Sequence, residues 1–108
     1  MLTIDKKPDS LYFGRPDART GATFLAVDDR PDNLFVLNAV ITASFPNSEV
    51  LTAGSATEGL AIASQLLLDG IVADVQMPGM GGIEMCRRLK ADPSTKDIPV
   101  LLITAHKS

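Results

Sequence analysis

The sequence has few of the features that mark secreted, membrane-embedded or nucleic-acid-binding proteins. Cys86 is its only cysteine, so no disulfide can form within the chain, and a cytoplasmic location is expected. No apolar run approaches the roughly 20 residues that cross a bilayer, and the N-terminus lacks the continuous apolar stretch of a signal peptide. The net charge of −3, with scattered basic residues, argues against direct binding to nucleic acid or to an anionic membrane.

The length of 108 residues suits one domain with one core. Residues 1–22 are polar and rich in turn formers, so we expect a flexible N-terminal extension in which the apolar residues 11–13 can act as an anchor. From Thr23 onward, strand-like and helix-like segments alternate. We expect strands at residues 23–27 and 49–53, a strand ending at Asp74, and a last strand over about 99–104. The β-α-β-α-β-α-β order predicts an α/β fold with a parallel sheet and helices on both faces.

The three expected helices have recognisable starts and apolar faces. The first follows Asp29 and has a proline in its first turn. The second begins with a capping-box pattern, in which Ser55 accepts from the backbone of Glu58 and Glu58 reaches back, and runs to about Leu67. The predicted apolar faces are Leu34, Leu37, Val40 and Ile41 on the first helix, and Ile83, Cys86 and Leu89 on the third.

Polar side chains stand where three of the strands end. Asp28 and Asp29 close the first strand, Asp74 closes the third, and Thr104 closes the last. Neighbouring parallel strands bring these positions to one edge of the sheet, where open α/β sheets bind their ligands. Three carboxylates gathered there repel one another unless a hard cation joins them. The sequence therefore predicts a metal site at that edge.

Each of these residues also has an ordinary interpretation. Asp28 or Asp29 alone can simply cap the first helix, Asp74 can be a turn residue, and Thr104 can be a strand former. Their joint position at matching strand ends, in order, favours the site. We expect Cys86 and the methionines Met77, Met80 and Met85 to be packing residues rather than ligands, and His106 to be solvated.

The residues that close the strands resemble those of response regulator receiver domains of bacterial two-component systems. The matching motifs are Val27–Asp29, then Asp74 with the loop at 77–82 (MPGMGG), then Thr104. The resemblance covers residues 23–108. It implies a flavodoxin-like, doubly wound parallel sheet. It also implies a cytoplasmic phosphoacceptor that assists its own phosphorylation and dephosphorylation but is not an enzyme acting on a separate substrate.

The resemblance also implies a role for each site residue. Asp74 would take a phosphoryl group from a sensor histidine kinase or a phosphotransfer protein. Asp28, Asp29, Asp74 and the backbone carbonyl of Gln76 would hold Mg²⁺ or Mn²⁺. The Thr104 hydroxyl would donate to the phosphoryl oxygen.

The sequence departs from the family after the fourth strand. Receivers continue with a helix, a fifth strand that ends in a lysine, and a last helix, and Lys107 is too close to Thr104 to be that lysine. We therefore expect a receiver that stops early, with strand order 2-1-3-4. The strand at 100–103 would then be an exposed apolar edge, and one face of the sheet would lack a helix. Self-association through this edge or face, or cover from residues 11–13, is expected.

Two other functions remain open at this point. A Mg²⁺-dependent phosphatase of the haloacid dehalogenase type also uses an aspartate nucleophile, but it requires a second aspartate two residues on, where this chain has Gln76. A pseudo-receiver, or an inactive fragment that acts as an interaction module, is consistent with the missing lysine.

Overall fold

A computed structural model of the chain describes residues 21–104. Its strands form one parallel sheet in the order β2-β1-β3-β4. They are β1 (Thr23–Val27), β2 (Glu49–Ala53), β3 (Gly70–Asp74) and β4 (Val100–Ile103), and the helices between them are α2 (Pro31–Ser44), α3 (Ala56–Gln65) and α4 (Gly82–Ala91). The predicted fold class and the strand order 2-1-3-4 are confirmed.

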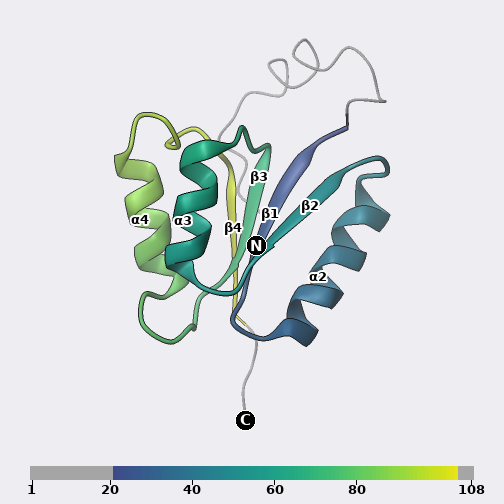
Figure 1. Ribbon diagram of the computed structural model, residues 1–108, viewed down its shortest axis with the longest axis horizontal. Coiled ribbons are helices and arrows are strands. Elements are labelled where there is room, and N and C mark those ends of the chain that lie inside the picture. The colour runs from purple at the N-terminus through teal and green to yellow at the C-terminus, as the bar shows by residue number, and fades with distance from the viewer. Residues whose placement is uncertain (1–20, 105–108) are drawn as a thin grey trace.

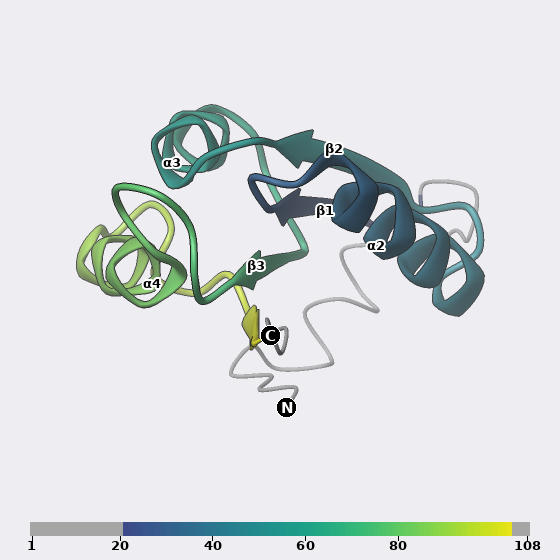
Figure 2. The ribbon, with the colours of Figure 1, turned by 90° about the horizontal axis from the view of Figure 1, so that it is seen from below.

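The helices divide between the two faces of the sheet. Helix α2 packs on β1 and β2 from one side, whereas α3 and α4 lie on the other (Figure 1 and Figure 2). This arrangement follows from the strand order, because right-handed crossovers that move in opposite directions across a sheet place their helices on opposite faces. The crossover from β1 to β2 moves in one direction, and those from β2 to β3 and from β3 to β4 move in the other. Because the strands are parallel, all of them end at one edge, and the loops that follow β1 and β3 lie beside each other there.

The core lies between the sheet and the helices α3 and α4. Alternate strand residues point into it, among them Leu25, Val27, Ile71 and Ala73, all of which are at most 1% exposed. Met85 of α4 is fully buried against them. The methionines Met77 and Met80 also pack on this core, and Cys86 is partly buried at its margin. The expectation that these are packing residues is confirmed.

The apolar faces of two helices differ from those predicted. On α4 the buried residues are Gly82, Met85 and Leu89, whereas Ile83 is 47% exposed. Residues 85 and 89 are four apart and so share a face of the helix, whereas Ile83 lies about 160° away from Met85. On α2, Ile41 is buried but Val40 is 55% exposed.

One side of the sheet is only half covered by the described residues. Leu101 and Ile103 of β4 alternate with the core-facing Val100 and Leu102, so they point to the side of α2, and each is half-buried. Helix α2, however, packs over β1 and β2 and not over β3 and β4. The predicted lack of a covering helix therefore holds for residues 21–104. Residues 11–13, the predicted anchor, lie outside the described residues.

Within residues 21–104, no helix is long and apolar enough to cross a membrane.

Candidate metal centre

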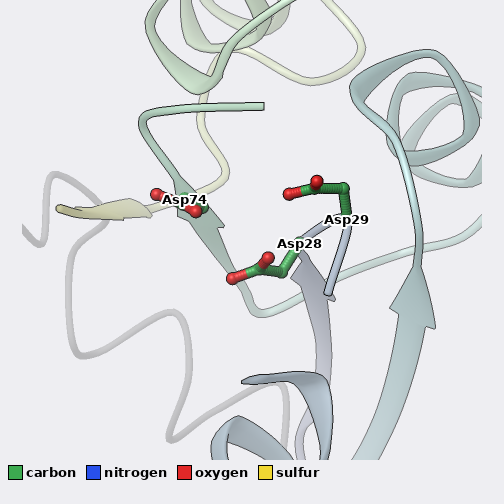
Figure 3. A group of neighbouring side chains, drawn as sticks. All are labelled: Asp28, Asp29 and Asp74. Carbon is green, nitrogen blue, oxygen red and sulfur yellow. The ribbon is translucent and has the colours of Figure 1, made fainter. Parts of the chain in front are cut away.

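Three carboxylates meet beyond the ends of β1 and β3. Asp28 and Asp29 follow the last residue of β1, and Asp74 is the last residue of β3 (Figure 3). One oxygen from each lies within 4.8 Å of the others. Asp28 and Asp74 are 1% and 0% exposed, whereas Asp29 is exposed. The sequence-based prediction that these three side chains come together is therefore confirmed by the geometry.

Asp28 is held in place by the first turn of α2. Its Oδ1 accepts from the backbone N–H of Arg30 at 3.0 Å, and its Oδ2 accepts from the side-chain amide of Asn33 at 3.2 Å. The Asp28 backbone N–H itself donates to the carbonyl of Ala53 in β2. Arg30 and Asn33 were not among the predicted site residues. The available signal was their spacing, since Asn33 follows Asp28 by five residues across a proline-initiated helix start.

Asp74 is fixed by the start of the loop that follows it. Its Oδ1 accepts from the backbone N–H of Gln76 at 3.1 Å, and the next N–H, of Val75, donates to the carbonyl of Ile103 in β4 at 2.8 Å. Two glycines shape this loop. Gly79 has a positive φ of 73°, and Gly82 starts α4 so close to β3 that a Cβ there would overlap the Asp74 carbonyl oxygen. The glycines thus allow α4 to begin directly against the end of β3.

The two remaining predicted site residues stand near this centre without direct contacts that define a role. Gln76 supplies the N–H to Asp74 and lines the adjacent cleft. Thr104 follows Ile103, which is the register partner of Asp74, so it stands at the same edge of the sheet and is exposed. The metal role of the Gln76 carbonyl and the phosphoryl role of the Thr104 hydroxyl stay predictions. His106 and Lys107 lie outside the described residues.

The three carboxylates fit a hard divalent cation. Mg²⁺ binds oxygen ligands at about 2.1 Å, so two ligands on opposite sides stand about 4 Å apart. The observed limit of 4.8 Å needs only a small rotation of a side chain, and the exposed Asp29 is free to make it. Without a cation, the buried carboxylates of Asp28 and Asp74 repel by about 3 kcal/mol at this separation and an effective dielectric constant of about 20, whereas water screens the exposed Asp29 more strongly. The set therefore suits a bound metal ion better than three unneutralised charges.

A cleft of about 520 Å³ opens beside the carboxylates. It lies between the loop after β1 and the loop after β3. Its walls are formed by Asp29, Arg30, Val75, Gln76, Met77, Pro78, Gly79 and Gly81. A small anionic group can therefore reach the metal centre from solvent through this cleft.

The sequence is similar to those of known proteins. The family model "Response regulator receiver domain" matches residues 24–108. The response regulator PleD of Caulobacter vibrioides is 49% identical over 84 residues, which are 78% of this chain and 18% of PleD. The signal transduction histidine-protein kinase BarA of Escherichia coli is 32% identical over 100 residues, 93% of this chain and 11% of BarA. The chain thus spans less than a fifth of the length of these relatives.

Solved structures agree with the sequence matches. The N-terminal domain of a response regulator receiver protein from Methanoculleus marisnigri superimposes with a TM-score of 0.72 at 35% identity, over 79% of this chain and 68% of that one. The response regulator TrrA of Thermotoga maritima, solved in complex with Mg²⁺-BeF, gives 0.71 at 27% identity, over 79% and 70%. From its fold, its aspartate cluster and these matches, the chain belongs to the response regulator receiver domain family.

Proposed function

We propose that this chain accepts a phosphoryl group on Asp74. The observation that carries the proposal is the position of Asp74, which is fully buried at the end of β3 with two further carboxylates within 4.8 Å and a cleft beside it. A carboxylate can attack phosphorus when cations and fixed donors offset the charge on the transferring group. The backbone N–H of Gln76, which donates to Asp74 Oδ1, orients the nucleophile for such an attack.

Each site residue has a part in this function. Asp28 and Asp29, with Asp74 and the Gln76 carbonyl, hold Mg²⁺ or Mn²⁺, which supplies charge neutralisation at the phosphoryl oxygens when bound. Asn33 and the Arg30 backbone keep Asp28 oriented through the hydrogen bonds described above. The Thr104 hydroxyl donates to the phosphoryl oxygen after transfer. These assignments for Gln76 and Thr104 follow the family pattern.

The donor we propose is a phosphohistidine of a sensor histidine kinase or of a phosphotransfer protein, in the cytoplasm. Support comes from the relatives, since BarA is named a signal transduction histidine-protein kinase. A phosphatase of the haloacid dehalogenase type is disfavoured, because the chain belongs to the receiver family. The inactive-fragment alternative is decided by experiment.

The test is the intact mass of the chain after incubation with phosphoramidate, with and without Mg²⁺. We expect a metal-dependent gain of one phosphate in the parent chain and none in Asp74→Asn. Asp97→Asn is the matched control, because Asp97 is exposed and precedes β4 at the opposite edge of the sheet. If the parent chain is folded but forms no adduct, the proposed function is wrong and the alternative of an inactive interaction module is favoured.

A second proposal concerns association with a second copy of this chain. The half-buried apolar residues Leu101 and Ile103 of the edge strand β4 lie on the side of the sheet that α2 leaves open. On the outer side of α2, Phe35 and Val36 are 77% and 56% exposed. Apolar edges and faces of this kind favour pairing between chains.

A further inference from the structure

A single divalent metal ion does not neutralise the aspartate cluster. Three carboxylates and one divalent cation leave a net charge of −1. A phosphoryl donor is itself anionic, so it approaches a site that still repels it. A further cationic group beside the cleft would remove this repulsion and hold the donor during attack.

Arg30 is the cationic side chain that the described residues place there. It lines the cleft together with Asp29 and Gln76. The other described cationic side chains are engaged elsewhere: Arg87 and Arg88 pair with Glu84, Lys90 donates to backbone carbonyls beside β4, and Lys96 is exposed in the segment that precedes this strand. Within residues 21–104, Arg30 is therefore the one positive side chain at the mouth of the cleft.

The base of the Arg30 side chain is fixed, whereas its guanidinium is loosely held. Its backbone N–H donates to Asp28, and Pro31 follows it as the first residue of α2. The guanidinium stands 3.8 Å from the carboxylate of Asp32, with 52% and 74% of the two side chains exposed. An exposed pair at this distance contributes little, so the guanidinium can leave Asp32 at low cost.

We propose that Arg30 is an anion-binding residue of this site, which contacts the phosphoryl group of the donor in the cleft and releases Asp32 to do so. The inference rests on the proposed function and adds to it a residue that sets the affinity for the donor. The planar guanidinium, with its paired N–H donors, matches two oxygens of a phosphoryl group.

The step it serves can be written with phosphoramidate as the donor. An Asp74 carboxylate oxygen forms a bond to phosphorus while the P–N bond breaks, and ammonia leaves with the protons already on nitrogen. The phosphoryl oxygens keep their charge throughout, so Arg30 contacts the same group before and after transfer. Arg30 takes no proton and forms no covalent bond in this step.

The test is the rate of adduct formation against phosphoramidate concentration in the 108-residue chain, at saturating Mg²⁺. Arg30→Gln should raise the half-saturating donor concentration by about 10- to 100-fold, the value of a hydrogen bond to a charged group, with a smaller change in the maximal rate. The half-saturating donor concentration of Arg30→Lys should lie between those of the parent chain and Arg30→Gln. Asp32→Asn, which frees the guanidinium, should lower the half-saturating concentration, by about twofold.

Mg²⁺ affinity, measured by calorimetry without donor, separates this role from a structural one. Removal of a positive charge near the cluster should leave the Mg²⁺ affinity of Arg30→Gln unchanged or make it tighter. A loss of Mg²⁺ affinity that parallels the loss of donor affinity would instead mean that Arg30 supports Asp28, and would overturn the inference. Equal half-saturating concentrations in all four proteins would overturn it as well.

Beryllofluoride, a mimic of the phosphoryl group, makes the result independent of transfer. With Mg²⁺ present, its binding measured by fluorine NMR should weaken in Arg30→Gln, even if the parent chain forms no adduct. In that case the proposed function fails and the Arg30 inference stands. A parent chain that binds neither phosphoramidate nor beryllofluoride overturns both.

Discussion

At the scale of single residues, Asp28, Asp29 and Asp74 differ in what holds them. Asp28 is buried and accepts from Arg30 and Asn33, and Asp74 is buried and accepts from Gln76, whereas Asp29 is exposed. Replacement of a buried carboxylate disturbs the fold as well as the metal site. Asp29 is therefore the residue at which the metal site can be tested with the least structural cost.

Asp29→Asn should make the chain more stable without metal and less responsive to it. The substitution removes repulsion between carboxylates that lie within 4.8 Å, so the metal-free free energy of unfolding should rise by a few tenths of a kcal/mol to about 1 kcal/mol. In the parent chain, Mg²⁺ at ten times its dissociation constant should add about 1.4 kcal/mol. In the variant this gain should fall by more than half.

Urea unfolding with and without Mg²⁺ measures both effects, and Asp97→Asn serves again as the control. An equal Mg²⁺-dependent gain in parent and variant would contradict the assignment of Asp29 as a ligand.

At the scale of elements, the side chains of Ser55 and Glu58 cap the N-terminus of α3. Ser55 Oγ accepts from the backbone N–H of Glu58 at 3.1 Å, as predicted, but the Glu58 carboxylate reaches the N–H of Gly54 at 2.8 Å. The Glu58 carboxylate therefore accepts from the backbone N–H of Gly54, the residue between β2 and the N-cap Ser55. Ser55→Ala should lower the free energy of unfolding by about 1 kcal/mol.

The matched control for Ser55→Ala is Ser64→Ala in the same helix. Ser64 Oγ donates only to the carbonyl of Ala61 in the preceding turn and is exposed, so this change should be neutral or slightly stabilising. Chemical denaturation of both variants measures the difference. Equal effects of the two substitutions would show that the cap contributes nothing.

Glu84 on α4 gives the fold a pH-sensitive contact. Hydrogen bonds from Arg88, and then from Arg87, hold the pKa of its carboxyl below the ordinary value of 4.5. A lowered pKa in the folded state means that the contact stabilises the fold above pH 4.5 and that this contribution is lost as the pH falls through the lowered value. Glu84→Gln should therefore lower Tm slightly at pH 7, and the difference should shrink as the pH falls below 4.5.

The measurement for Glu84 is Tm at several pH values and at low salt, since 44% of the Glu84 side chain is exposed and salt screens its interaction with the two arginines. A difference between parent and variant that does not shrink as the pH falls below 4.5 would point to packing rather than charge.

At the scale of the whole molecule, the described residues leave one side of the sheet open beside α2. If β4 and this face pair with a second copy, the mass measured by light scattering should rise with protein concentration. Leu101→Lys places a charge on the open side and should give a monomer across the same range.

The control for Leu101→Lys is Ala61→Lys, which adds the same charge at an exposed position of α3. It should associate as the parent does. A parent chain that is monomeric at all concentrations would contradict the association.

The sequence by itself determined the strands and the aspartate cluster, and its resemblance to receiver domains implied the strand order. Apolar runs that end in polar residues locate β1, β3 and β4, and parallel crossovers then force Asp28, Asp29 and Asp74 to one edge. These features depend on local pattern and on topology, both of which can be read along the chain.

Only the tertiary structure decided which helix faces are buried and what surrounds the aspartates. Met85 rather than Ile83 faces the core because the helix axis is set by contacts with α3 and the sheet. The Asn33 amide reaches Asp28, and Arg30 lines the cleft, because the first turn of α2 folds back over the end of β1. Such contacts depend on angles between elements, and hydrophobic periodicity along one element carries no information about them.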